Sequence, residues 1–143
     1  MAYSFYIEPS VNCVFVRHFD VFHVDDTLNQ YHEMIEKPEY LPNMNVIRDV
    51  LTTTLPDEFG YKFFSEKTPD RYKDIESVMG QSNVAWVLGN GKDYAIMHQF
   101  TLTARFADSL SHITRKPFRT LEAAREWLEI PPDYEIHHDA IAP

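Results

Sequence analysis

The stretch FRTLEAAREWL, residues 118–128, decides the fold prediction because a strand passes directly into a capped helix within it. Thr120 suits the N-cap position, and Glu122 falls in the first helical turn, where the helix dipole favours an acidic side chain. Ala124 and Leu128 then recur at helical spacing and share one face. A strand followed by a short amphipathic helix, closing a chain with the same unit upstream, indicates an α/β domain.

The composition fits one folded domain. The chain has 143 residues, of which 44% are hydrophobic and 14% aromatic, and this length is sufficient to bury a core. Its formal net charge of −9, with only 13 scattered Lys and Arg residues, opposes binding to nucleic acid or to an acidic membrane surface. Since no apolar run approaches the ~20 residues of a membrane span and no signal-peptide pattern opens the chain, we expect a cytoplasmic protein with no membrane span.

Hydrophobic periodicity alternates along the chain between strand-like and helical spacing. Strand patterns cover residues 3–7, 11–19, 44–51, 84–88 and 113–118. Helical patterns run from residue 25 or 26 to before Pro38, from 68 to 80, from 93 to about 109, and from 120 to 128. The predicted order is therefore ββαβαβαβα, with an initial hairpin and a mixed, mostly parallel sheet. We expect one domain over residues 1–131, followed by a disordered C-terminal tail over residues 132–143.

Three segments carry a family likeness: the Phe19-Asp20 end of the second strand, the run PEYLPNMNVIRD at 38–49, and the 118–128 close. Together with the order of elements, they resemble the SpoIIAA-like branch of the STAS domain family over about residues 3–131. The resemblance implies a sheet with helices packed chiefly on one face, in a regulatory or interaction module. These segments bear structure and carry no catalytic signature.

The phosphorylation switch that the resemblance implies is not matched. In the anti-anti-sigma factors of this family, an aspartate at the end of the third strand is followed by a phosphorylated serine. Asp49 matches the aspartate, but Val50 and Leu51 follow it. The threonines at 52–54 come too late for the motif and are interpreted as a solvated edge. We therefore expect no phosphorylation of the sigma-regulating type.

Two histidine–carboxylate pairs could support catalysis. His18 with Asp20, and His23 with the acidic pair at 25–26, combine imidazole with carboxylate as a general base requires. No serine or cysteine nucleophile accompanies them at a recognisable spacing. The favoured interpretation is polar side chains that face water at the end of a strand.

Neither the single cysteine nor the C-terminal histidines predict a cofactor or metal site. Cys13 lies within an apolar strand pattern, where a thiol is buried and inert. In the run His137-His138-Asp139, adjacent side chains on an extended chain point to opposite sides, whereas metal ligands need a fixed scaffold. We expect no cofactor and no metal.

The turn Gly89-Asn90-Gly91-Lys92 leads from a strand into a helix. Such a turn can present backbone N–H groups to an anion at the positive end of the helix dipole. It lacks the spacing of a P-loop or of a dinucleotide fingerprint. A simple turn with positive φ at the glycines is favoured, and Asn90 and Lys92 are kept as candidate binding residues.

The connection over residues 52–67 is unusually long and aromatic. It contains Phe59, Tyr61, Phe63 and Phe64, and the first three alternate, which places them on one side of an extended segment. The favoured interpretation is that these rings cover a face of the sheet. The functional alternative is a lid over an apolar pocket, or a contact surface for a partner or a second copy.

The sequence therefore predicts a non-enzymatic interaction module that binds a protein partner or itself. The alternative is a binder of an apolar small molecule or lipid, with the aromatic insertion as its lid. An enzyme of unknown reaction is the third possibility, which a histidine–carboxylate pair inside one cleft would support.

Overall fold

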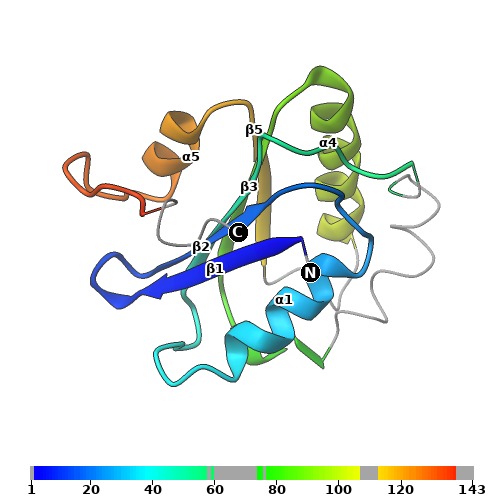
Figure 1. Ribbon diagram of the computed structural model, residues 1–143. Helices are drawn as coiled ribbons and strands as arrows, with labels where there is room; N and C mark the ends of the chain where they lie inside the picture. The colour runs from blue at the N-terminus through cyan, green and yellow to red at the C-terminus, as the bar shows by residue number, and fades with distance from the viewer. Residues whose placement is uncertain (1, 58, 60–73, 76, 107–112, 138–143) are drawn as a thin grey trace.

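The computed structural model describes residues 2–57, 59, 74, 75, 77–106 and 113–137, which contain a five-stranded sheet (Figure 1). The strands are β1 (Tyr3–Glu8), β2 (Cys13–His18), β3 (Asn45–Val50), β4 (Asn83–Leu88) and β5 (Thr114–Phe118). They lie side by side in chain order, with β1 antiparallel to β2 and every other neighbouring pair parallel. The predicted α/β class and the mixed, mostly parallel sheet are confirmed.

Helices connect the parallel strands, because parallel neighbours need a crossover. The helices are α1 (Asp26–Ile35) between β2 and β3, α4 (Gly91–Phe106) between β4 and β5, and α5 (Leu121–Trp127) after β5. Residues 74, 75 and 77–79, between β3 and β4, are also helical. Among the described residues, no helix is long and apolar enough to cross a membrane.

The first two strands form the predicted hairpin. A 3-10 turn, Pro9–Val11, joins them, and Asn12 completes the turn with a left-handed φ of 53°, a conformation that asparagine tolerates better than most residues. The register pairs Tyr3 with His18 and Glu8 with Cys13. This hairpin places β1 at one edge of the sheet.

The two flanking helices begin in different ways. At α5 the Thr120 hydroxyl accepts a hydrogen bond from Ala123 N–H at 3.2 Å, which confirms the predicted N-cap. At α1 Asp25 occupies the N-cap position without a side-chain cap bond. Its neighbour Asp26 instead accepts a hydrogen bond from His23 N–H through Oδ2 at 2.9 Å, and thereby shapes the turn into the helix.

Both faces of the sheet are buried. The first face, covered by α1 and α4, includes Val46 and Trp86; the second face, covered by α5, includes Phe15 and Ile47. Figure 1 shows α5 set apart from α1 and α4 across the sheet. Cys13 lies on the second face, where burial raises the pKa of its thiol to about 12, which confirms the expected buried cysteine.

Residues 132–137 pack on the second face, whereas the sequence pattern predicts a tail from residue 132. The Tyr134 ring stacks on Phe15, and the Tyr134 hydroxyl lies 3.0 Å from the Tyr6 hydroxyl. His137 N–H donates to the same Tyr6 hydroxyl at 2.8 Å, and Ile136 packs against the core. The expectation of a disordered tail is therefore wrong as far as residue 137, and residues 138–143 lie outside the described part of the chain.

Candidate functional site

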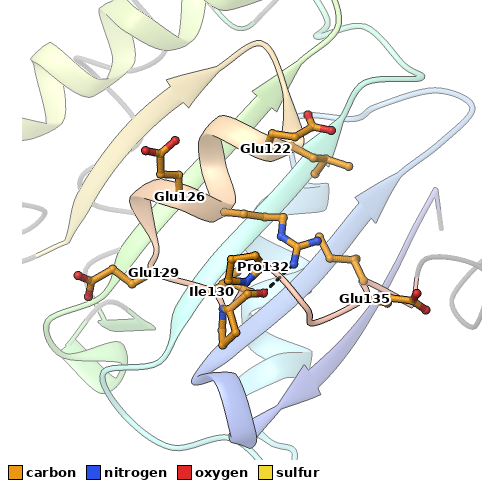
Figure 2. Close-up of a pocket in the computed structure, with 10 residues that line it drawn as sticks. Glu122, Glu126, Glu129, Ile130, Pro132 and Glu135 are labelled. Atoms are coloured by element: carbon orange, nitrogen blue, oxygen red, sulfur yellow. Dashed lines mark hydrogen bonds between the residues drawn. The ribbon is translucent and has the colours of Figure 1, made fainter.

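A groove with a volume of about 930 Å³ lies between α5 and the segment that follows it (Figure 2). We call it the α5 groove. Its apolar lining comes from Leu121, Ile130, Pro131, Pro132 and Ile136. Its charged lining comes from Glu122, Arg125, Glu126, Glu129 and Glu135. Figure 2 shows the four carboxylates spread around the hollow and pointing away from one another.

The turn that closes α5 has the geometry of a Schellman motif. Glu129 N–H donates to the Glu126 carbonyl and Ile130 N–H donates to the Arg125 carbonyl, each at 3.1 Å. Glu129 has a φ of 57°, in the left-handed region that the motif requires and that glycine adopts most readily. Left-handed backbone costs roughly 1–2 kcal/mol for a residue with a Cβ. The groove therefore carries a glutamate at a position where glycine would be more stable.

Arg125 ties the segment after α5 to the helix. Its Nη2 donates to the Pro131 carbonyl at 2.9 Å and also to the Tyr134 carbonyl. Because the guanidinium is engaged by backbone carbonyls, it braces the wall of the groove. Within the described residues, none of the four groove glutamates forms an ion pair. The α5 groove is therefore an apolar hollow with a negative rim.

Asn90 and Lys92 have structural roles. Asn90 Oδ1 accepts a hydrogen bond from Asp93 N–H at 2.8 Å, so Asn90 is the N-cap of α4. Asp93 Oδ2 accepts hydrogen bonds from Asn90 Nδ2 at 3.1 Å and from Leu55 N–H at 3.0 Å. Lys92 is exposed and pairs with Asp57 at 3.3 Å. Because the carboxylate of Asp93 already lies at the positive end of the helix, these contacts favour the simple turn over an anion site.

Gly89, which opens this turn, is required because of a close backbone contact and not because of a positive φ. A Cβ at Gly89 would lie 2.5 Å from the Leu51 carbonyl oxygen, which is too close for any other residue without a backbone shift. Among the described glycines, Gly80 has the positive φ, at 70°. The prediction of positive φ at 89 and 91 is wrong, and close approach of the segments after β3 and β4 selects glycine at 89.

The aromatic insertion contributes a core residue. Phe59 is 3% exposed, and its ring centroid lies 5.4 Å from that of Phe22 in the core of the first face. Its side chain offers no surface to a partner. Tyr61, Phe63 and Phe64 lie outside the described residues.

The predicted histidine–carboxylate pairs do not form among the described residues. His18 is fully buried, and its Nε2 lies 2.9 Å from Arg48 Nη1; Asp20 instead accepts a hydrogen bond from the hydroxyl of Thr53 through its backbone carbonyl, at 2.7 Å. His23 engages Asp26 through its backbone N–H. The expectation that these histidines face water is wrong for His18. In the same part of the chain, no group of three potential metal ligands occurs.

Arg48 and the acidic rim of the groove are two features that the predictions from sequence did not include. Arg48 stands in β3 where the alternation of Val46 and Val50 predicts an apolar side chain on the first face; a charge inside a strand buried on both faces was the available signal. The acidic rim of the groove was also readable, because Glu122, Glu126 and Glu129 recur at helical spacing. The left-handed backbone at Glu129 had no such signal.

Comparison of the chain with protein-family models, curated proteins and solved structures finds no match.

Proposed function

We propose that this domain is a non-enzymatic interaction module of STAS-like type, which binds a basic segment of a partner protein in the α5 groove. Two properties of the groove support this proposal. Its apolar lining offers contact area to leucine-like side chains, and its glutamates offer charge complementarity to lysine and arginine. The mixed, mostly parallel sheet fits the STAS-like part of the proposal.

Glu129 is the observation that carries the proposal. Residues with unfavourable backbone conformations concentrate at functional sites, because function maintains them against a cost in stability. Glycine would relieve the left-handed backbone, but it would remove one carboxylate from the rim. A basic partner gives that carboxylate a role.

A partner of opposite charge fits the groove better than a second copy does. In a symmetric dimer built on this surface, the same patch faces itself, so the groove glutamates of the two copies would oppose one another. Like charges at short distance destabilise such a contact. We therefore assign the groove to a protein partner.

The test uses short peptides in which lysine alternates with leucine, and matched peptides in which glutamate replaces lysine. Binding to the full chain is measured by fluorescence anisotropy at several salt concentrations. We expect the lysine peptide to bind, with an affinity that falls as salt screens the rim, and the glutamate peptide not to bind. The double substitution Glu126→Gln with Glu129→Gln should weaken binding about fivefold, since each exposed ion pair contributes roughly 0.2–1 kcal/mol.

The matched control removes the same charge elsewhere. Glu36 and Glu39 are exposed and lie after α1, so Glu36→Gln with Glu39→Gln changes the net charge equally and leaves the groove intact. Affinity should be unchanged in this control. Equal loss in both double variants would show that the peptide senses only net charge, and would overturn the proposal, as would the absence of binding to the unmodified chain.

A further inference from the structure

Arg48 is a fully buried cation on the first face of the sheet, opposite the α5 groove. Its Nη1 lies 2.9 Å from His18 Nε2, and its Nη2 donates to Gln30 Oε1 at 2.7 Å. Its Cζ lies 4.8 Å from the ring centroid of Tyr31 and 5.3 Å from that of Trp86. A guanidinium removed from water in this way is costly unless an anion compensates it.

Within the described residues, no carboxylate lies at ion-pair distance from Arg48. Two acids of α1 stand nearby in the fold: Asp26 and Glu33 both act electrostatically on Tyr3, as does Arg48. Asp26 accepts the His23 N–H through Oδ2. The buried positive charge is therefore not matched by direct contact with a negative one.

The side chains around Arg48 present several hydrogen-bond donors without acceptors. In the described part of the chain, four buried nitrogens have no hydrogen-bond partner: Arg48 Nε, His18 Nδ1, Gln30 Nε2 and Trp86 Nε1. We call these four residues the Arg48 cluster. Buried polar groups are nearly always hydrogen-bonded, so four orphaned nitrogens around one cation require an explanation.

Each of the four nitrogens is a donor. The Nε atoms of arginine and tryptophan carry hydrogen in every state. Gln30 turns its Oε1 toward Arg48, which leaves the amide NH₂ at the free end. The guanidinium has no acceptor, so His18 Nε2 accepts from it and the imidazole proton lies on Nδ1. The Arg48 cluster therefore lacks an acceptor, and one with several lone pairs would serve it best.

The charge of the cluster restricts the acceptor to a monovalent anion. Burial and the Arg48 charge hold the pKa of His18 well below its usual range, so the imidazole is neutral and the guanidinium supplies the one positive charge of the cluster. A phosphate dianion would leave excess negative charge buried. A carboxylate carries one charge, offers about four lone-pair sites on two oxygens, and matches the plane of a guanidinium.

We propose that the Arg48 cluster binds the carboxylate group of a small organic acid. The cluster lies toward the carboxyl end of β2 and β3, the end of the strands at which open α/β sheets bind ligands. Aromatic rings enclose it: Phe22 lies 4.4 Å from His18 between ring centroids, and Tyr31 and Trp86 stand over the guanidinium. These aromatic neighbours favour an acid with an aromatic or apolar body, and benzoate is the probe of choice.

The experiment follows the fluorescence of Trp86. The chain has two tryptophans, so Trp127→Phe leaves Trp86 as the single reporter beside Arg48. Benzoate, acetate, chloride and phosphate are titrated separately, and the melting temperature is recorded in parallel. We expect benzoate to change the fluorescence saturably and to raise the melting temperature, acetate to do so more weakly, and phosphate to have no effect.

Arg48→Met should abolish the benzoate response, because it retains the volume of the side chain and removes its charge and donors. Arg115→Met is the matched control: Arg115 is also buried and lies over an aromatic ring, that of Phe100 at 5.3 Å, and its loss should leave benzoate binding intact. If Arg48→Met fails to fold, Gln30→Met decides, with an expected loss of at least about tenfold in affinity.

Three results would overturn the proposal. The first is no saturable response to either carboxylate. The second is a benzoate response that survives Arg48→Met or Gln30→Met. The third is chloride binding as tight as benzoate binding, which would show a site for any small anion without preference for a carboxylate.

Discussion

The ring of Tyr134 stacks on the ring of Phe15, with centroids 5.5 Å apart and an interplanar angle of 24°. Phe15 in turn stacks on Tyr6 of β1, and these two ring centroids are closer, at 4.9 Å. The three rings join β1, β2 and the segment after α5 into one core. The wall of the α5 groove is therefore fixed to the sheet by this stack and to α5 by Arg125.

We expect Tyr134→Ala to lower the free energy of unfolding by about 2–3 kcal/mol, since it removes a half-buried aromatic ring and a hydrogen bond. Urea unfolding measures the change. Tyr94→Ala is the control, because Tyr94 lies on the exposed side of α4 with 36% of its surface accessible. A loss no larger than that of Tyr94→Ala would contradict the packing of residues 132–137.

Glu129→Gly should raise the free energy of unfolding by roughly 1 kcal/mol, because glycine adopts the left-handed conformation without the Cβ penalty. The same variant should bind the lysine–leucine peptide more weakly. Glu129→Ala separates the two effects, since it removes the carboxylate but retains the Cβ. Stability that rises equally in both variants would mean that the backbone at 129 carries no cost.

Stability should depend on the protonation of His18. Its pKa is lowered in the folded chain, so below the unfolded value of about 6.5 the unfolded chain binds a proton that the native chain does not. The free energy of unfolding therefore falls with falling pH, by up to about 1.4 kcal/mol per pH unit from this residue. Denaturant unfolding between pH 7 and pH 5 measures how the free energy of unfolding depends on pH. This dependence should be weaker in His18→Gln than in the unmodified chain, and an equal dependence in the two would show that His18 does not cause it.

Phe59→Ser should destabilise the fold by about 3 kcal/mol or more, because it removes a buried ring that packs on Phe22 and introduces a polar group. Peptide binding by the remaining folded fraction should be unchanged. Thermal unfolding and anisotropy distinguish these outcomes. If Phe59→Ser lost peptide binding but kept its full stability, the result would support the alternative that the aromatic insertion is a contact surface.

Cys13 should resist thiol reagents while the chain is folded. The thiol is inaccessible and its pKa is raised to about 12 by burial, and the thiolate is the reactive form. Labelling by a chromogenic disulfide reagent should proceed only after urea unfolds the chain. Rapid labelling in native buffer would place Cys13 at a surface.

The architecture was predictable because it depends on local signals. Two strand patterns with a short polar break gave the hairpin, and Thr120 with its hydrophobic spacing gave α5, since hydrophobic period and capping chemistry act over a few residues. The tail was mispredicted because an irregular segment has no period. Its signal was weaker: Tyr134 and Ile136 alternate with polar residues, which fits an extended segment on an apolar face.

The candidate sites depend on tertiary contacts, which a single sequence does not show. His18 and Asp20 are neighbours in sequence, yet His18 meets Arg48 from the next strand. Arg48 in turn donates to Gln30 of the helix between these two strands. The helical spacing of the glutamates showed the acidic rim in the sequence. The α5 groove itself exists because the chain turns back at Glu129, which the sequence does not show. Asn90 caps α4, as asparagine before a helix commonly does. The hydrogen bonds by which Asp93 links Asn90 to Leu55 depend on tertiary packing, which the sequence does not show.

The core of the second face combines β2, which the ribosome synthesises early, with residues 134–137, which it synthesises late. Ribosomes add about 5–20 residues per second, so Phe15 and Ile47 remain uncovered for seconds while the rest of the chain is synthesised. The strands can form their hydrogen bonds before residues 134–137 are made, but the second face of the sheet cannot be fully covered until then. We therefore expect productive folding to wait for the segment after α5, and the apolar second face to be accessible to chaperones until that segment is made.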